Sequence, residues 1–388
     1  MASQGKTPVV LDFSGIKAGG GVQLALNFLE EVAASPPPDM ELFHVFPRQG
    51  ALAQHAQSIA GPRRLSCPTS PIRRVLFEHS TLQDWIRKNG IRAIFTFFGA
   101  GIPHPPAVVS IVSVAYPILC YPESPYWQHI GARQRLAKSL LNRARVRRLK
   151  SATRIVVETQ VMRRRLSRVL GRAESEIVVG APAVSGFLEP VGPRPGGTLD
   201  VLCLSGMAPH KNLWRLPRIA EELARMLPGS LPGIRFHLTV GKEAWRADLD
   251  PADRAVADAL EGLFVFHGSV HPRDIGNLYA KADVLLSLSD LESFSNNYME
   301  AWRARVPLVA SDRDFAREIC GDSAAYAEPH DPAGVARAIA ELHGDPARRQ
   351  RMLEAGDRLL ALLPSRTEKM RQIFDVIRGS LAVPGGRP

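Results

Sequence analysis

The sequence has little cysteine and no long apolar run. No two cysteines form a CxxC pair and none clusters with histidine, which argues against a structural zinc site and a disulfide framework. We therefore expect reduced thiols in a cytoplasmic protein. No apolar run reaches the ~20 residues that span a bilayer, and the N-terminus lacks the longer apolar stretch of a signal peptide. The four cysteines are Cys67, Cys120, Cys203 and Cys320.

Common nucleotide-binding and nucleic-acid-binding motifs are also missing. The chain has no P-loop GK[ST] sequence and no GxGxxG fingerprint, only the glycine triplet Gly19, Gly20 and Gly21. It has no zinc finger, helix-turn-helix signal or basic run interleaved with aromatic residues, so we expect no nucleic-acid partner. A glycine triplet alone is most often a flexible turn. Here it follows an apolar strand pattern (Val9–Phe13) and opens a helical one, where glycine permits close backbone approach to a phosphate or sugar.

Acidic residues are scarce in one segment. Residues 131–172 contain 14 Lys and Arg and a single acid, Glu158, although the net charge of the whole chain is only +11. The basicity of the protein is therefore local. Leu136, Leu140 and, less regularly, Leu149 mark an apolar side of the helical pattern Gly131–Lys150. Such a helix either binds an anionic membrane surface or is a solvated helix with an ordinary core stripe.

Apolar strand patterns alternate with helical patterns along the 388 residues. The alternation predicts an α/β protein with parallel sheets covered by helices. Glu189–Gly197 (EPVGPRPGG) has the composition of a linker. We expect two Rossmann-like domains that face each other across a cleft, at residues 1–188 and 198–365, the first completed by a C-terminal helix at 366–381.

The strongest local signal is LSDLESFSNNYMEAW, Leu288–Trp302. A strand pattern ends at Leu288, Glu292 follows on a loop, and Ser295 is a good N-cap for a helix from Asn296. The N–H groups and partial positive charge at a helix N-terminus suit a diphosphate. From these residues alone, the better interpretation of Glu292 is a solvated loop acid and that of Glu300 a surface helix acid.

Residues Gly268–Pro329 resemble the C-terminal half of retaining glycosyltransferases of the GT-B fold, family 4. The family hallmark is two glutamates separated by seven residues, and Glu292-SFSNNYM-Glu300 has this spacing in its usual surroundings, with VPLVASD downstream. The resemblance implies that Glu292 contacts the transferred sugar and Glu300 the ribose of the donor. It also implies that the backbone amides of the intervening loop face the diphosphate, namely those of Ser293, Phe294, Ser295 and Asn296.

Two further stretches extend the resemblance. LSGMAPHKNLWRL, Leu204–Leu216, is similar to the family loop whose lysine neutralises the donor phosphates, which implies this role for Lys211. Many relatives carry an arginine five residues earlier, where this chain has Gly206, so His210 or Arg215 are candidates for the missing charge. The glycine triplet matches a family loop near the donor diphosphate. The family's N-domain histidine has no counterpart in Val112–Pro117, where Tyr116 is the nearest polar candidate.

The resemblance implies a retaining hexosyltransferase that moves a sugar from a nucleoside-diphosphate sugar to the hydroxyl of a sugar or lipid-linked acceptor. The N-terminal domain would hold the acceptor and the C-terminal domain the nucleotide sugar, in bacterial surface polysaccharide or lipopolysaccharide assembly at the inner face of the membrane. Two DxD triplets, at Asp248 and Asp312, read as solvated loop acids, and no metal or other cofactor is expected. The alternatives are an inactive GT-B scaffold that binds membrane surfaces, and a GT-B-like epimerase or phosphorylase.

Overall fold

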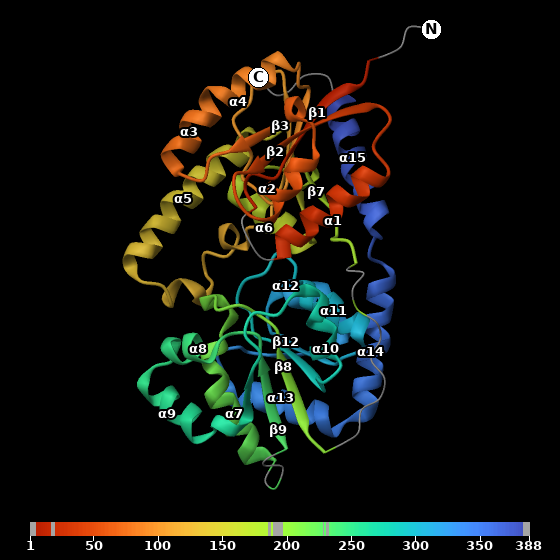
Figure 1. Cartoon of the computed structure of the whole chain (residues 1–388). Helices are drawn as coiled ribbons and strands as arrows, with labels where there is room; N and C mark the ends of the chain where they lie inside the picture. Colours follow the sequence, from red (N-terminus) through yellow and green to blue (C-terminus); the bar gives the residue numbers. More distant parts are fainter. Residues whose placement is uncertain are drawn as a thin grey trace. The chain divides into compact units, whose positions relative to one another are not determined.

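The computed structural model describes residues 5–16, 20–184, 188, 197–227, 229 and 233–382. The chain divides into two compact units (Figure 1). Unit 1 contains residues 1–120, 133–183 and 364–388, and unit 2 contains residues 121–132 and 184–363. The short segment 121–132, which we expected in the N-terminal domain, thus clusters with the C-terminal half. Of the expected linker Glu189–Gly197, only Gly197 lies within the described residues.

Unit 1 is built on a seven-stranded parallel sheet of order β3-β2-β1-β4-β5-β6-β7. Its strands are β1 (Thr7–Asp12), β2 (Met40–Pro47), β3 (Arg64–Cys67), β4 (Ala93–Thr96), β5 (Val109–Ser113), β6 (Arg154–Val157) and β7 (Ile177–Val179). Its helices are α1 (Gly20–Ala34), α2 (Ala51–His55), α3 (Pro71–His79), α4 (Thr81–Lys88), α5 (Ala132–Ser151), α6 (Gln160–Leu170) and α15 (Arg366–Ala382).

Both faces of this sheet are covered, as its apolar strands require. Val9 and Leu11 pack on one face with Phe28 of α1 and Phe374 of α15. Val10 lies on the opposite face in a cluster that includes side chains of α3 and α4. The last helix of the chain therefore completes the core of the first unit, and Figure 1 shows α15, in blue, beside α1.

Unit 2 has a six-stranded parallel sheet of order β10-β9-β8-β11-β12-β13. Its strands are β8 (Leu199–Cys203), β9 (Ile234–Leu238), β10 (Phe264–Phe266), β11 (Val284–Ser287), β12 (Leu308–Ser311) and β13 (Ala324–Ala327). Its helices are α7 (Leu216–Met226), α8 (Lys242–Asp248), α9 (Pro251–Ala259), α10 (Ile275–Tyr279), α11 (Asn296–Ala304), α12 (Asp314–Cys320), α13 (Pro332–Gly344) and α14 (Pro346–Ala361).

Packing in the core of unit 2 explains why α14 has a glycine at position 356. Trp302 of α11 is buried, and a Cβ at Gly356 of α14 would lie 2.6 Å from its ring. Gly356 thus permits α14 to pack closely on α11. This contact supports the helix that starts beside the predicted site.

Candidate functional site

The candidate site lies where the strand order of unit 2 reverses. Strands β9 and β10 lie on one side of β8, and β11, β12 and β13 lie on the other. The loops that leave the carboxyl ends of β8 and β11 therefore diverge. In open parallel sheets ligands bind at such a point. Lys211 follows β8 and Glu292 follows β11, so the topology brings together two residues that are far apart in the sequence.

The side chains of Lys211 and Glu292 form an ion pair, with 21% and 13% of their side-chain surface exposed. Lys211 ends a short 3₁₀ helix, Pro209–Lys211. The Ser289 hydroxyl donates to the same Glu292 oxygen, Oε1, at 2.8 Å. The lysine and the first glutamate of the predicted set thus point toward one another, at a place where both remain accessible.

The N-terminus of α11 borders the same place. Ser295 is its N-cap residue, but the serine side chain makes no capping hydrogen bond. The preceding Ser293 is buried, and Phe294 and Asn296 are half-buried. A small cleft in front of the two strand ends is lined by residues that include Ser205, Lys211, Ser287, Ser289 and Asn297.

Glu300 lies on the second turn of α11. Burial raises the pKa of its carboxyl group, although the hydrogen bond from Tyr279 of α10 acts in the opposite direction. The Tyr279 hydroxyl donates to Oε2 of Glu300 at 3.2 Å. Tyr279 therefore fixes the orientation of the second glutamate of the motif.

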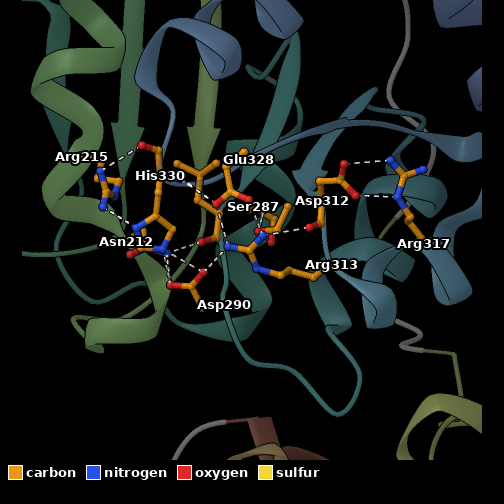
Figure 2. Close-up of polar contacts among 11 residues, drawn as sticks. Asn212, Arg215, Ser287, Asp290, Asp312, Arg313, Arg317, Glu328 and His330 are labelled. Atoms are coloured by element: carbon orange, nitrogen blue, oxygen red, sulfur yellow. Dashed lines mark hydrogen bonds and ion pairs between the residues drawn. The ribbon is translucent and has the colours of Figure 1, made fainter. Parts of the chain in front are cut away.

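A buried acid outside the predicted set of site residues lies beside the pair. Asp290 accepts hydrogen bonds from Asn212 Nδ2 at 2.8 Å and Arg313 Nη2 at 2.9 Å, and His330 Nε2 lies 2.9 Å from Oδ2 (Figure 2). Burial alone would raise the pKa of Asp290, but the bonds from His330, Asn212 and Arg313 lower it. Asp290 follows an apolar strand and precedes Glu292 by two residues, which is the signal that could have identified it.

Arg215, a candidate for the missing positive charge, is engaged elsewhere. Its guanidinium bonds the His330 ring and stacks on Trp214, with 4.1 Å from Cζ to the ring centroid. His129, from the segment 121–132, stacks on His330 at 5.5 Å and contacts Trp214 edge-on at 5.1 Å. His210, the other candidate, meets the ring of Tyr126 from the same segment at 6.0 Å. Sequence patterns gave no indication that 121–132 packs here, because these contacts are tertiary.

The glycine triplet belongs to unit 1. Gly19 lies outside the described residues, whereas Gly20 and Gly21 form the first turn of α1 rather than a loop. A Cβ at Gly21 would meet only ordinary contacts at 3.7 Å, so packing does not require glycine there. Tyr116, also in unit 1, lies under the guanidinium of Arg145 at 4.2 Å. A role of these residues beside Lys211 and Glu292 stays a prediction.

Three of the DxD acids have structural partners. Asp250 caps α9 by accepting from the Asp253 amide at 2.7 Å, Asp312 pairs with Arg317, and Asp314 accepts from the Tyr121 hydroxyl at 3.0 Å. All four acids of the two triplets, Asp248, Asp250, Asp312 and Asp314, are exposed, as we expected for solvated acids, although Asp248 ends α8 rather than lying in a loop. Among the described residues, no group of three or more His, Cys, Asp or Glu side chains is arranged to hold a metal ion.

The basic segment 131–172 separates into two parts with different environments. On α6, Arg163 pairs with Glu174 at 3.3 Å and Arg165 donates to the Cys120 carbonyl at 3.1 Å. On α5, Leu149 is buried, but Leu136 is 63% and Leu140 54% exposed. The alternative that Leu136 and Leu140 belong to an ordinary core stripe is therefore wrong. No described helix has the length and apolar character to cross a membrane.

Comparison with known proteins identifies the sequence around this site. Residues 198–345 match the family model of glycosyl transferases group 1. This segment contains Lys211, Asp290, Glu292 and Glu300. No curated protein sequence matches the chain significantly.

Solved structures share the fold over nearly the whole chain. Sucrose-phosphate synthase from Thermosynechococcus elongatus is 16% identical with a TM-score of 0.71, over 97% of this chain and 100% of that one. Anabaena HepE in complex with UDP is 16% identical with a TM-score of 0.68, over 96% and 100%. WaaG, a glycosyltransferase involved in lipopolysaccharide biosynthesis, is 14% identical with a TM-score of 0.69, over 96% and 100%. The fold is GT-B, and together with the family match it indicates a glycosyltransferase enzyme.

Proposed function

We propose that this chain, with its GT-B fold and its glycosyl transferases group 1 segment, moves a sugar from a nucleoside-diphosphate sugar to an acceptor hydroxyl with retention at the anomeric carbon. The observation that supports this most directly is the ion pair of Lys211 and Glu292 at the switch point of the second sheet. When the bond between sugar and phosphate breaks, negative charge develops on the diphosphate and positive charge on the sugar. The Lys211 cation matches the first charge and the Glu292 carboxylate the second.

Each group has a separate task in this proposal. Lys211 and the amides of residues 293–296 receive the negative charge of the leaving diphosphate. A diphosphate at the N-terminus of α11 competes with Glu292 for Lys211, and the released carboxylate then orients and stabilises the sugar. Glu300, held by Tyr279, binds the ribose hydroxyls. Lys211 and the helix amides do the work that a metal ion does in other transferases, so the proposal includes no metal.

Two solved relatives of the fold support the substrate class. HepE has been crystallised with UDP and with UDP-glucose, and WaaG is named as an enzyme of lipopolysaccharide biosynthesis. By analogy we propose a nucleotide sugar as donor and a sugar or lipid-linked acceptor in bacterial surface polysaccharide or lipopolysaccharide assembly.

The test begins with a thermal-shift panel of UDP-, GDP- and ADP-sugars. A donor at 100 times its dissociation constant adds ~2.7 kcal/mol to the free energy of unfolding. With the donor that binds, Glu292→Ala should lose transfer and donor hydrolysis by about 100-fold or more while its melting temperature stays near that of the wild type. Asp312→Asn, at an exposed acid that pairs with Arg317, is the matched control.

The alternatives give different products. A phosphorylase requires inorganic phosphate, and an epimerase releases no nucleoside diphosphate as its final product in the way that a transferase does. An inactive scaffold binds surfaces without cleaving any donor. Near-normal turnover by Glu292→Ala would remove the role that we assign to this residue.

One surface of unit 1 favours a second activity, docking on an anionic membrane, which brings the enzyme to a lipid-linked acceptor. Arg148 of α5 and Arg74 of α3 both bond Glu78, so the two helices touch, and Figure 1 shows them along one side of the unit. Their exposed apolar side chains are Ile72, Val75, Leu76, Leu136, Leu140 and Leu141. We call these residues, with the exposed arginines of the two helices, the α3–α5 surface.

Charge on the α3–α5 surface is of one sign. Helix α5 contains no acidic residue, and Glu78, the one acid of α3, is 0% exposed. Apolar side chains inside a cationic border fit a leaflet of anionic lipids, where each Lys or Arg contributes about 1 kcal/mol.

Sedimentation with vesicles tests the docking. The wild type should bind phosphatidylcholine vesicles that contain phosphatidylglycerol and should not bind pure phosphatidylcholine. Replacing Leu136, Leu140 and Leu141 by Ser should reduce binding severalfold. Leu362→Ser, at a leucine that is 79% exposed on unit 2, is the control. Equal binding by both variants would contradict the docking surface without affecting the transfer reaction.

A further inference from the structure

We infer that Asp290 is a positioning residue that holds Lys211 and Glu292 in their productive relation, an inference that rests on the proposed transfer reaction. Asp290 stands two residues before Glu292, and its side chain is 0% exposed. It lies on the loop that follows β11, and its partners come from the loops that follow β8, β12 and β13. One carboxylate thus connects the ends of four neighbouring strands.

The connection to Lys211 runs through Asn212. The Asn212 side chain is fully buried and donates from Nδ2 both to Asp290 Oδ2 and to the Leu288 carbonyl, each at 2.8 Å. The backbone N–H of Asp290 donates a hydrogen bond to the His210 carbonyl at 2.8 Å. Asn212 has a positive φ of 55°, a strained conformation for a residue other than glycine that these bonds maintain. The residues on both sides of Lys211 are therefore anchored to the loop that carries Glu292.

The other partners hold Asp290 itself. Arg313 bonds Asp290 and also both carboxylate oxygens of Glu328, at 2.6 and 2.7 Å (Figure 2). His330 Nε2 donates toward Asp290, and this tautomer leaves His330 Nδ1 to accept from Arg215. A buried carboxylate is tolerated only when it is paired in this way. These partners occupy Asp290, which leaves Lys211 and Glu292 to meet the substrate.

Asp290→Asn tests the inference because it keeps the shape of the side chain. It removes the negative charge and replaces one acceptor oxygen by an NH2 donor. The amide group that replaces the carboxylate would face the Arg313 and His330 donors, so the loop should shift. We expect kcat for cleavage of UDP-glucose, GDP-mannose or ADP-glucose, whichever the wild type cleaves, to fall about 10- to 100-fold, since small displacements of a reacting group have effects of this size. The donor KM should stay within about threefold, because Glu300 and its hydrogen bond from Tyr279 are untouched. Asp312→Asn is the control for loss of a loop acid.

A double variant separates positioning from general stability. In a Lys211→Met background, Asp290→Asn should reduce kcat by less than about threefold, because two residues that act through one another are not additive. An equal loss in both backgrounds, or an Asp290→Asn enzyme that matches Asp312→Asn, would overturn the inference.

A second pair of variants covers the case in which Asp290→Asn does not fold. His330→Gln keeps an N–H donor for Asp290 and should retain most of kcat, whereas His330→Leu should lose it. Equal rates for these two variants would also count against the inference. A wild type that cleaves no sugar of the UDP, GDP and ADP panel overturns the proposed function, and the inference with it. An active wild type with an unaffected Asp290→Asn overturns the inference alone.

Discussion

Glu300 is a carboxylate whose pKa is raised by burial on α11 and whose orientation is set by Tyr279. If it binds the ribose, Glu300→Ala should weaken nucleoside diphosphate binding about 10- to 100-fold, the equivalent of one charged hydrogen bond at about 1.5–3 kcal/mol. Calorimetric titration with UDP, GDP and ADP measures this. Glu354→Ala, at an exposed position of α14, should bind as the wild type does. Unchanged affinity in Glu300→Ala would assign the ribose to other groups.

His44 is a buried histidine of β2 that stacks on Phe46 with 5.7 Å between ring centroids. Burial, and then the nearby His55, lower its pKa from the ordinary value of 6.5 to about 4. Between these two pH values the unfolded chain binds the proton and the folded chain does not. The stability that the neutral ring contributes is therefore present above about pH 6.5 and is lost as the pH falls toward about 4.

Urea unfolding of wild type and His44→Phe measures this loss. From about pH 7 to about pH 4 the free energy of unfolding of the wild type should fall by about 3 kcal/mol more than that of the variant, which keeps the aromatic stack but cannot titrate. Parallel pH profiles of the two proteins would contradict this prediction, because they would show that the pKa of His44 is the same in the folded and the unfolded state.

Helices α3 and α5 are joined by a single buried carboxylate. Glu78 is 1% exposed at its side chain and bonds Arg74 at 2.8 Å and Arg148 at 2.5 Å. Arg74 also donates to the Ser14 carbonyl at 3.2 Å, at the end of β1. This chain of contacts fixes α5, whose only buried residue is Leu149, to the body of unit 1.

Removing the carboxylate leaves two arginines without their shared partner. Glu78→Ala should lower the free energy of unfolding by about 3–5 kcal/mol, as for other broken buried pairs. Glu41→Ala breaks the exposed pair with Arg63 and should cost less than about 1 kcal/mol. Chemical denaturation compares the two. Similar small losses would mean that α5 is held mainly by other contacts.

The order of the chain does not follow the division into units. Helix α15 comes last in the sequence but belongs to unit 1, where Phe374 is 2% exposed and lies 6.0 Å from the ring of Phe28. The segment 121–132 comes from the first half of the chain but belongs to unit 2. Each unit therefore depends on a segment that the chain contributes from elsewhere.

Phe374→Ala should destabilise unit 1 by about 3–5 kcal/mol, the usual effect of removing a buried aromatic ring. Hydrogen exchange should accelerate in β1, β4 and β5 and remain unchanged in the strands of unit 2. Arg378→Ala on the same helix removes only partly exposed pairs with Asp39 and Asp375 and is the control. Faster exchange in both units would indicate that they unfold as one.

Local patterns in the sequence were enough for most elements of both sheets. Apolar runs predicted β1, β4, β5, β8 and β11 to within two residues at each end, because parallel strands buried on both faces are nearly continuous apolar sequence. The predicted ranges were Val9–Phe13, Ile94–Phe98, Val108–Val114, Leu199–Ser205 and Val284–Leu288. The strands β2, β3 and β13 did not stand out. They contain residues such as His44, Arg64 and alanine, whose burial depends on neighbours rather than on their own preference.

The sequence by itself determined the alternation of strands and helices and the short motif that carries Glu292 and Glu300, because both are properties of neighbouring residues. The tertiary structure alone decided that Lys211 meets Glu292, that Asp290 connects their loops, that residues 121–132 pack in unit 2, and that Leu136 and Leu140 face outward. These facts depend on the order of strands in a sheet and on which helix covers which face. Contacts of that kind join residues far apart in the chain, 115 positions in the case of Arg215 and His330, and no local pattern encodes them.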